Sequence, residues 1–511
     1  MTRRHWMVAI LLAWALSLGW LVKRQFFQST GARLAEAALA VPPGSIFFRL
    51  EVGGQQVGFA SSTIDTLKDS IRVLDQLVLD VPALGHIHRT TARSSAVVNR
   101  ALRLLHVDAT FDDDKGQYSA RGVITGDSVL QITLVSGRDT QLTRLRLTRP
   151  IILPSLLPLR LAFGGELKGG AISSVRIFDP MLLAERDVAV RVGAETTMVV
   201  ADSADYDSTA MAWVPVHFDT LRAFRIDQES SGLTVRTWID AQGHAVRLSS
   251  PVGFTLQRSA FEIAYENFRR RDTVRLARAS ATAGQGDIIA ATAMAAGARL
   301  QSAGPAQVRA RLSGVSLGGL RLGGGRQRVS GDTLLVQREG PAQLRARYRL
   351  PASDTALAAF LRPEPLIQST NPRIEAQARL ILQRERDAAK AAELLTHWVS
   401  DHVKPEIATT IPSALQVLER RRGDCNEHTV LFVALARASG LPARPVAGLV
   451  SLGGRFYYHA WPEVYLGDWV AVDPTFDQFP ADAAHLRLAI GSLARQVELA
   501  RVIGTLKVEA L

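Results

Sequence analysis

The sequence predicts an α+β protein with an apolar N-terminal helix, an antiparallel β-rich region and a C-terminal domain that mixes helices with strands. Three observations predict this arrangement. Residues 6–22 form an uncharged apolar run, residues 45–270 alternate polar and apolar positions between turn residues, and helix formers dominate after residue 371. A chain of 511 residues, 47% of them hydrophobic, is long and apolar enough for about three domains.

The composition limits the disulfides and the kinds of partner that the chain can have. One cysteine, Cys425, excludes an intramolecular disulfide, so each domain must be stabilised by its own core. The net charge of +12 can indicate an anionic partner such as a lipid surface, nucleic acid or an acidic polymer. The longest basic runs, however, are RRR at 269–271 and 420–422, and the remaining excess is spread along the chain. We therefore expect solvated strand faces and no nucleic-acid partner.

The first apolar run predicts a membrane anchor. Residues 6–22, WMVAILLAWALSLGWLV, have basic residues on both sides and would span about 26 Å as a helix, the short end of a membrane span. No small-x-small cleavage site follows the run, which favours an uncleaved anchor. The N-terminal charges favour a cytoplasmic start. We expect residues 1–24 to form a cytoplasmic tip and single-pass anchor in a bacterial inner membrane, residues 25–44 a linker, and the bulk of the chain to be periplasmic.

Residues 45–270 predict an antiparallel β domain. SIFFRLEVGGQQVGFAS, with Gly53 and Gly54 at its centre, and LTVRTWIDAQGHAVRLSS, with a turn at 240–243, both predict hairpins. Between them, residues 150–165, PIILPSLLPLRLAFGG, are apolar and interrupted by proline, which excludes a central strand or a long helix. We interpret this segment as a linker or as a cover over an open sheet. The region resembles the half-barrels of bacterial lipoprotein-carrier-like proteins in architecture and in its WIDxxG hairpin, which implies lipid binding as an alternative.

Residues 271–365 predict a small second β domain. Short alternating runs such as QVRARLSGV and TLLVQRE are separated by glycine-rich turns. The glycines at 318, 319 and 323–325 are followed by neither a helix start nor Lys-Ser/Thr, so they do not form a phosphate-binding loop. We expect them to be turn residues in a sandwich-like sheet.

Residues 366–511 predict the C-terminal domain. Asn371 can cap a helix that has Pro372 at its first position, and two apolar stripes before residue 403 indicate two helices. Ser413 and Gln416 fit a capping box for a third, short helix.

Cys425 begins a fourth predicted helix, in the stretch RRGDCNEHTVLFVALARASG. Asp424 and Glu427 fit a capping box around it, and Gly440 ends the apolar run. A free cysteine is often only a buried small hydrophobe. The first helical turn, however, offers unpaired N–H groups and the positive end of the helix dipole, which favour a thiolate. On this position alone, the inert and reactive interpretations are balanced.

A nucleophilic thiol also needs a base and a residue that orients the base. RFYYHAWPEVYLGDWVAVDPTFD predicts two strands joined through Gly467 and Asp468, with His459 on the first and Asp473 at the end of the second. The blocks GDCNEHTVLFVALARASGLPARPVAG, HAWPEVYL and WVAVDPT resemble the core motifs of the transglutaminase-like superfamily in order and spacing. The resemblance implies a papain-like fold and an acyl-thioester mechanism, with Cys425 as nucleophile, His459 as general base and acid, and Asp473 orienting the imidazole.

The register of this hairpin tests the triad. A two-residue loop would pair Pro462 with Asp473 and place Asp473 and His459 on opposite faces. A three-residue loop would set Asp473 opposite Trp461, diagonal to His459 and on its face. The triad therefore predicts a three-residue loop, or a bulge near Pro462.

Four further residues each have a structural interpretation beside or in place of a functional one. Trp461 and His428 are candidate substrate-binding residues, although Trp461 also fits packing and His428 also fits a partly exposed helix position one turn after the nucleophile. Glu463 is expected at a solvated strand end. Arg444 is expected to pack or to pair structurally, with an acidic substrate group as the alternative.

A zinc site is the main alternative at the cysteine. Cys425, His428, His459 and Asp473 offer suitable ligand types, but structural zinc favours several cysteines and the helix start suits a nucleophile better. We expect neither a metal nor a cofactor.

The expected function is hydrolysis of amide bonds in proteins or peptides by a membrane-anchored thiol enzyme. Calcium-dependent cross-linking members of the superfamily carry tryptophan after the nucleophile, whereas Asn426 stands here, and the core has no carboxylate cluster for calcium. Cross-linking by a protein-glutamine acyltransferase is one alternative, and a non-catalytic envelope scaffold or lipid-binding protein is another. The β domains would present or select substrate, and the oligomeric state stays open.

Overall fold

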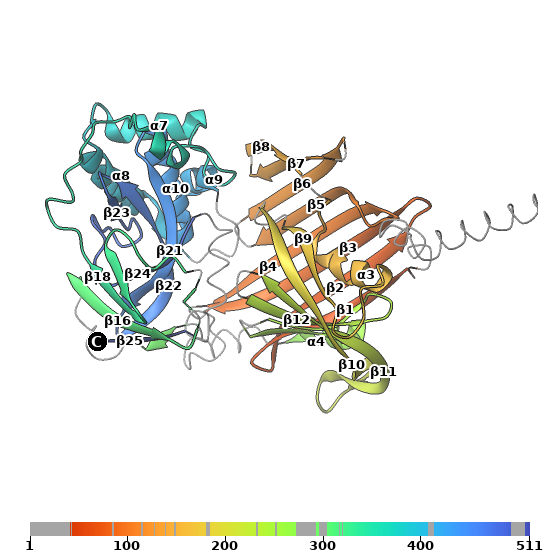
Figure 1. Ribbon diagram of the computed structural model, residues 1–511. Helices are drawn as coiled ribbons and strands as arrows, with labels where there is room; N and C mark the ends of the chain where they lie inside the picture. The colour runs from red at the N-terminus through yellow and green to blue at the C-terminus, as the bar shows by residue number, and fades with distance from the viewer. Residues whose placement is uncertain are drawn as a thin grey trace, which may run out of the picture.

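The computed structural model describes residues 41–491 and 506–511, except for residues 42, 84–85, 114–115, 127, 138, 148–149, 180–183, 231–232, 251–252, 272–292, 296–303, 316, 319 and 407–412. The described chain is β-rich, with large antiparallel sheets, and forms two lobes that lie side by side (Figure 1). The described residues between 44 and 271 form the first lobe, and those between 293 and 491 together with 506–511 form the second. The expected membrane segment, residues 6–22, lies outside the described residues. No helix within the described ranges is both long and apolar enough to cross a membrane.

A fourteen-stranded antiparallel sheet forms the described part of the first lobe, in the order β8-β7-β6-β5-β4-β3-β2-β1-β14-β13-β12-β11-β10-β9. The chain enters at the centre, runs outward to β8, crosses to the opposite edge at β9 and returns to pair β14 with β1. The strands are β1 (Gly44–Val52), β2 (Gln55–Thr66), β3 (Ser70–Ala83), β4 (His86–Asn99), β5 (Leu104–Asp113), β6 (Gly116–Thr125), β7 (Val129–Ser136), β8 (Asp139–Arg146), β9 (Ile172–Asp179), β10 (Ala184–Asp207), β11 (Ala212–Ser230), β12 (Leu233–Asp240), β13 (Ala245–Ser249) and β14 (Phe254–Ser259). Both predicted hairpins are confirmed, as β1–β2 and β12–β13.

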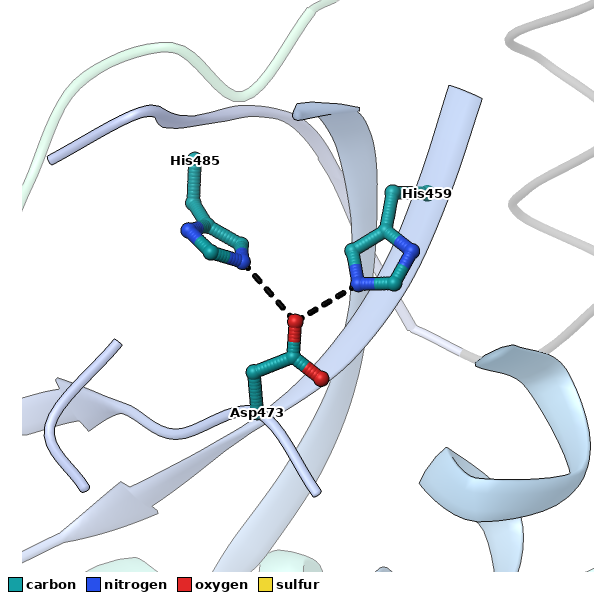
Figure 2. Close-up of side chains that lie close together, drawn as sticks. All are labelled: His459, Asp473 and His485. Atoms are coloured by element: carbon teal, nitrogen blue, oxygen red, sulfur yellow. Dashed lines mark hydrogen bonds and ion pairs between the residues drawn. The ribbon is translucent and has the colours of Figure 1, made fainter. Parts of the chain in front are cut away.

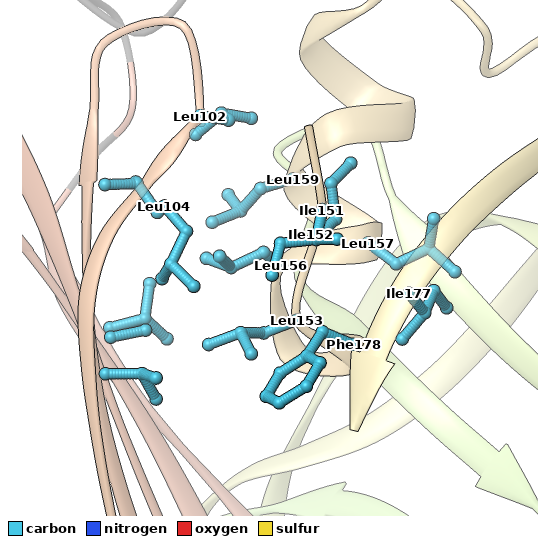
Figure 3. Close-up of a cluster of buried hydrophobic side chains, with 14 of the residues drawn as sticks. Leu102, Leu104, Ile151, Ile152, Leu153, Leu156, Leu157, Leu159, Ile177 and Phe178 are labelled. Atoms are coloured by element: carbon cyan, nitrogen blue, oxygen red, sulfur yellow. The ribbon is translucent and has the colours of Figure 1, made fainter. Parts of the chain in front are cut away.

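The proline-interrupted segment covers this sheet. It forms the short helices η2 (Pro154–Leu156) and α3 (Leu157–Phe163), each with proline in its first turn, where a missing N–H costs little. Its leucines are buried among side chains from both halves of the sheet, including Leu104 and Phe178 (Figure 3). The expected cover is therefore confirmed, and it fills the space with apolar side chains. After the last strand, η3 (Glu262–Glu266) and α4 (Asn267–Arg270) end the lobe.

Two packed sheets form one half of the second lobe. One has the order β17 (Gln327–Ser330), β18 (Thr333–Gln337), β16 (Gln307–Ser313) and β25 (Lys507–Ala510). The other contains β15 (Met294–Ala295), β22 (Arg455–Tyr465), β21 (Ala443–Leu452) and β24 (His485–Ile490), with β23 (Trp469–Ala471) on β22. Residues such as Val308, Leu334, Leu449 and Leu486 form a shared core. The expected sandwich-like region thus packs on the sheet of the C-terminal domain, and its strand β25 comes from the end of the chain.

Helices cover the other half of the second lobe. They are η5 (Thr355–Phe360), α7 (Pro372–Leu382), α8 (Ala388–His402), α9 (Ala414–Arg420) and α10 (Cys425–Ala438). The two helices predicted before residue 403 are confirmed, and Asn371 caps α7 by accepting a 2.9 Å bond from the Arg373 N–H. The predicted capping by Ser413 is wrong, because its hydroxyl instead accepts a 2.8 Å bond from the amide of Gln368.

Candidate active site

Cys425 is the first residue of α10, the helix at the centre of the second lobe. The helix packs against α7, α8 and α9 on one side and against β21 and β22 on the other. The predicted capping box is confirmed: the Asp424 carboxylate accepts the Asn426 N–H at 2.8 Å, and the Glu427 carboxylate accepts the Asp424 N–H at 2.8 Å. Gly423 precedes this turn, where a Cβ would lie 2.2 Å from the Glu427 side chain. The start of α10 is therefore held in one geometry.

The thiol of Cys425 is only partly exposed, and its surroundings disfavour a free thiolate. Burial raises the pKa of the Cys425 thiol well above its ordinary value, and the carboxylates of Asp424, Glu427 and Asp473 raise it further. The backbone N–H of Ala460, which hydrogen-bonds the sulfur, acts in the opposite direction. Burial and the neighbouring carboxylates thus act against the thiolate that the helix start favours. A proton acceptor is needed before the sulfur can react.

The hairpin of β22 and β23 supplies that acceptor. Tyr465 pairs with Trp469, which leaves a three-residue loop at 466–468, and the Val472 N–H donates to the Pro462 carbonyl at 3.0 Å. This register confirms the odd loop that the triad requires. His459 and Asp473 consequently lie on one face, with His459 Nε2 2.7 Å from Asp473 Oδ2.

His459 is positioned by rings on both sides. The Phe476 ring stacks on it with a centroid distance of 4.9 Å, and Trp461 lies at 6.0 Å with nearly parallel planes. Nε2 faces Asp473, and Figure 2 shows the other ring nitrogen, Nδ1, turned away from that carboxylate. Ala460, whose backbone N–H faces the Cys425 sulfur, follows His459 in the chain, so β22 passes the start of α10 next to this histidine.

Asp473 receives four donors. Oδ2 accepts from His459 at 2.7 Å and His485 at 2.9 Å, and Oδ1 accepts the N–H groups of Thr475 at 2.8 Å and Phe476 at 3.4 Å. Burial alone would raise the pKa of the Asp473 carboxyl, but the two histidines lower it well below its usual range. Asp473 is therefore an anion at every physiological pH.

His485 is a member of this cluster that sequence reasoning missed. It is fully buried at the start of β24 and contacts both Asp473 and Asp482. Its local sequence, ADAAHLRLA, is mostly apolar, and a histidine there also fits a core residue. Its twelve-residue spacing from Asp473 was the available signal, and that spacing has meaning only once the two segments are known to meet.

The cluster could supply metal ligands, since the donor atoms of His459, Asp473 and His485 lie within 4.8 Å of one another. Both histidine Nε2 atoms, however, contact Asp473 Oδ2 directly at 2.7 and 2.9 Å. Ligands around a tetrahedral zinc, at about 2.0–2.1 Å each, lie further from one another than this. The zinc alternative that included His428 also fails, because both of its ring nitrogens contact backbone carbonyls, those of Asp424 and Val403.

The two candidate substrate-binding residues are buried. His428 is 1% exposed rather than partly exposed, because it bridges the start of α10 to the carbonyl of Val403 at 3.0 Å. Trp461 is 0% exposed and packs beside His459. Neither side chain offers a surface to a substrate, and both instead support the site.

The expectations for the charged strand residues differ in outcome. Glu463 does not lie at a solvated strand end: it is 1% exposed, and its two carboxylate oxygens bind Arg444 and Arg487 at 2.6 Å each. Arg444 pairs structurally, as one of its two interpretations predicts. The partners of Glu463 lie on β21 and β24, so the sequence of β22 alone does not reveal them.

The match with a known family falls on this region. Residues 375–474 match the transglutaminase-like superfamily, and this range contains Cys425, His459 and Asp473. This part of the chain is a transglutaminase-like domain. Among curated proteins, none matches the sequence.

Solved structures resemble parts of this chain only distantly. A protein from Cytophaga hutchinsonii proposed to be a cysteine protease is 18% identical over 42% of this chain and 78% of its own, with a TM-score of 0.28. A β-barrel-like protein of unknown function from Brucella abortus is 12% identical over 43% of this chain and 95% of its own, with a TM-score of 0.31. A protein from Parabacteroides distasonis proposed to be a protease is 8% identical over 72% of this chain and 68% of its own, with a TM-score of 0.19. The family match, rather than these resemblances, identifies the domain.

Proposed function

We propose that the protein is a thiol enzyme that acts on amide bonds of proteins or peptides through an acyl-thioester on Cys425. The observation that supports this most is the 2.7 Å contact between His459 Nε2 and Asp473 Oδ2, on the strand whose Ala460 N–H hydrogen-bonds the cysteine sulfur. The three side chains then form a Cys-His-Asp triad, with the anion orienting the imidazole and leaving Nδ1 to accept the thiol proton.

The first half of the reaction forms the thioester. His459 Nδ1 takes the proton of the Cys425 thiol as the sulfur attacks the amide carbon, so proton transfer and attack are coupled. The backbone N–H of Cys425, in the first turn of α10, stabilises the oxyanion. The C–N bond then breaks, and the leaving amine receives the proton from His459.

The second half resolves the thioester. A water molecule attacks the acyl carbon and gives one proton to His459, the C–S bond breaks, and the sulfur recovers that proton. We propose water as the acceptor because Asn426 replaces the tryptophan that follows the nucleophile in cross-linking relatives. An amine acceptor would give the alternative, a protein-glutamine acyltransferase.

The remaining expectations belong to the same proposal. Residues 6–22 would anchor the protein in a bacterial inner membrane with the catalytic domain in the periplasm, and the β lobe would present or select the substrate. Protease protection in spheroplasts would test this orientation. A lipid carrier is not proposed, because buried leucines of α3 fill the space that a lipid would need (Figure 3).

Unfolded β-casein with an added primary amine distinguishes the activities. The full-length chain should give new peptide N-termini for a peptidase, deamidated glutamine for an amidase, or amine-modified glutamine for an acyltransferase. Each product should fall at least about 10²-fold in Cys425→Ala and His459→Ala. His217→Gln, in an exposed His–Asp pair of the first lobe, is the matched control. Equal product from wild type and Cys425→Ala, or none from either, would contradict the proposal and leave the non-catalytic scaffold.

A further inference from the structure

His485 has a carboxylate at each ring nitrogen. Nε2 lies 2.9 Å from Asp473 Oδ2 and Nδ1 lies 2.9 Å from Asp482 Oδ1, and the side chain is 0% exposed. A neutral imidazole carries one N–H, whereas both contacts require a donor because an ionised carboxylate can only accept. The geometry therefore calls for a buried imidazolium.

Asp482 is fixed in the position that this charge requires. Its Oδ1 accepts the Ala484 N–H at 2.9 Å, its Oδ2 accepts from the Gln478 side chain at 3.1 Å, and its own N–H donates back to Gln478 at 2.8 Å. Burial lowers the pKa of His485, but the hydrogen bonds and charges of the two carboxylates raise it more, so the net direction is upward. The pair of anions thus compensates the burial of the cation.

The His485 imidazolium and the proposed base, His459, contact the same carboxylate oxygen. Asp473 Oδ2 accepts from both His485 and His459, whose ring centroids are 5.7 Å apart (Figure 2). We propose that His485 is a positioning residue that holds the Asp473 carboxylate and offsets part of its charge, so that His459 stays neutral and able to accept the Cys425 proton.

This inference rests on the proposed function, in which His459 must be unprotonated to act. An isolated buried carboxylate beside His459 would stabilise the imidazolium, which cannot accept a proton. A second cation on the same oxygen weakens that stabilisation while it keeps Asp473 ionised. Asp473 can thus orient the His459 imidazole while His485 offsets part of the negative charge of Asp473.

The charged groups around His485 are few. Among the described residues, Asp473 after β23 and Asp482 before β24 act on His485, the His459 ring lies 5.7 Å away on β22, and Arg326 interacts electrostatically with Asp482. The rings of Trp461 and Phe476 fill the remaining contacts. A change at His485 should therefore act through Asp473.

The test is the pH dependence of Cys425 alkylation by iodoacetamide in the full-length chain, followed by intact mass. Plotted against pH, the alkylation rate should rise along a low-pH limb. In His485→Gln this acidic limb should move to higher pH by about one unit, because His459 keeps its proton to higher pH. At a fixed pH on that limb, labelling should fall about tenfold. Asp482→Asn, which removes one of the two anions that favour the imidazolium, should move the limb in the same direction by less.

The outcomes separate the two proposals. A wild-type limb that does not depend on His459 contradicts the proposed function itself. A His459-dependent limb that stays in place in both variants, or that moves to lower pH, contradicts only the proposed role of His485, which predicts a move to higher pH. Stoichiometric metal in the purified protein, with labelling restored by a chelator, would also contradict it. His217→Gln should leave the limb unchanged, and Asp482→Asn keeps the test decisive if His485→Gln does not fold.

Discussion

The two lobes bury different kinds of side chain. Of the 22 buried polar or charged residues in the described ranges, five lie in the first lobe and seventeen in the second. The main cluster of the first lobe is apolar throughout and is completed by the leucines of α3. Closed polar sets are more numerous in the second lobe, such as Glu463 with Arg444 and Arg487, and Asp473 with its two histidines, whereas the first lobe has Asp80 with Arg89 and Arg271.

This difference indicates what each core does. Apolar contacts are non-directional and tolerate changes that conserve volume, whereas a buried ion set is stable only when each donor meets its acceptor. A catalytic imidazole must be held in one orientation, which depends more on directional contacts than on how the surrounding space is filled. We therefore interpret the polar core of the second lobe as the scaffold of the site.

The largest expected effect is at Glu463. Glu463→Ala leaves the buried guanidinium of Arg487 without its carboxylate and should destabilise the second lobe by about 3–5 kcal/mol. Chemical unfolding followed by tryptophan fluorescence measures this loss. A cost under about 1 kcal/mol would mean that the ion set contributes no more than a surface pair, and the contrast between the lobes would fail.

The matching change in the first lobe is at Leu156, which is 0% exposed. Leu156→Ala should cost about 2–5 kcal/mol through the cavity it leaves, and Leu156→Met less than about 1.5 kcal/mol. Alkylation of Cys425 at low denaturant should not change in either variant. Slower alkylation in Leu156→Ala would show that the lobes are not independent.

The pH dependence of stability sharpens the comparison. Asp473, with its lowered pKa, contributes stability above the unfolded value near 4, which is lost as the pH falls through its folded pKa. His485, with its raised pKa, contributes stability below about pH 6.5, which is lost as the pH rises through its folded pKa. His485→Gln should therefore cost most between about pH 4 and 6.5, on the order of 1.5–3 kcal/mol, and less at alkaline pH. Thermal unfolding at several pH values measures this, and a cost independent of pH would contradict an ionised His485.

Local rules predicted the parts of the site that are local in sequence. The capping box of Asp424 and Glu427 follows from spacing alone. The hairpin register predicted that His459 and Asp473 share a face if the loop has three residues, and the structure has a three-residue loop. These contacts lie within one helix turn or one hairpin, where period and spacing carry the information.

The remaining features depend on contacts between distant segments. Glu463 was placed at a solvated strand end because its arginines lie on two other strands. His485 was missed because, although Asp482 lies three residues before it, the contact with Asp473 is made only when the fold brings the two segments together. The upward direction of the thiol pKa could not be predicted from the helix position of Cys425, because burial depends on the whole lobe.

The most direct measurement of the central claim is the rate of Cys425 alkylation at neutral pH in wild type and in His459→Ala. The thiol alone is disfavoured as a thiolate, so its reactivity should come from proton transfer to the imidazole that Asp473 orients. We predict that the wild-type protein reacts at pH 7 and that His459→Ala reacts at least about 10²-fold more slowly. Equal rates in the two proteins would contradict the claim that this polar core serves the cysteine.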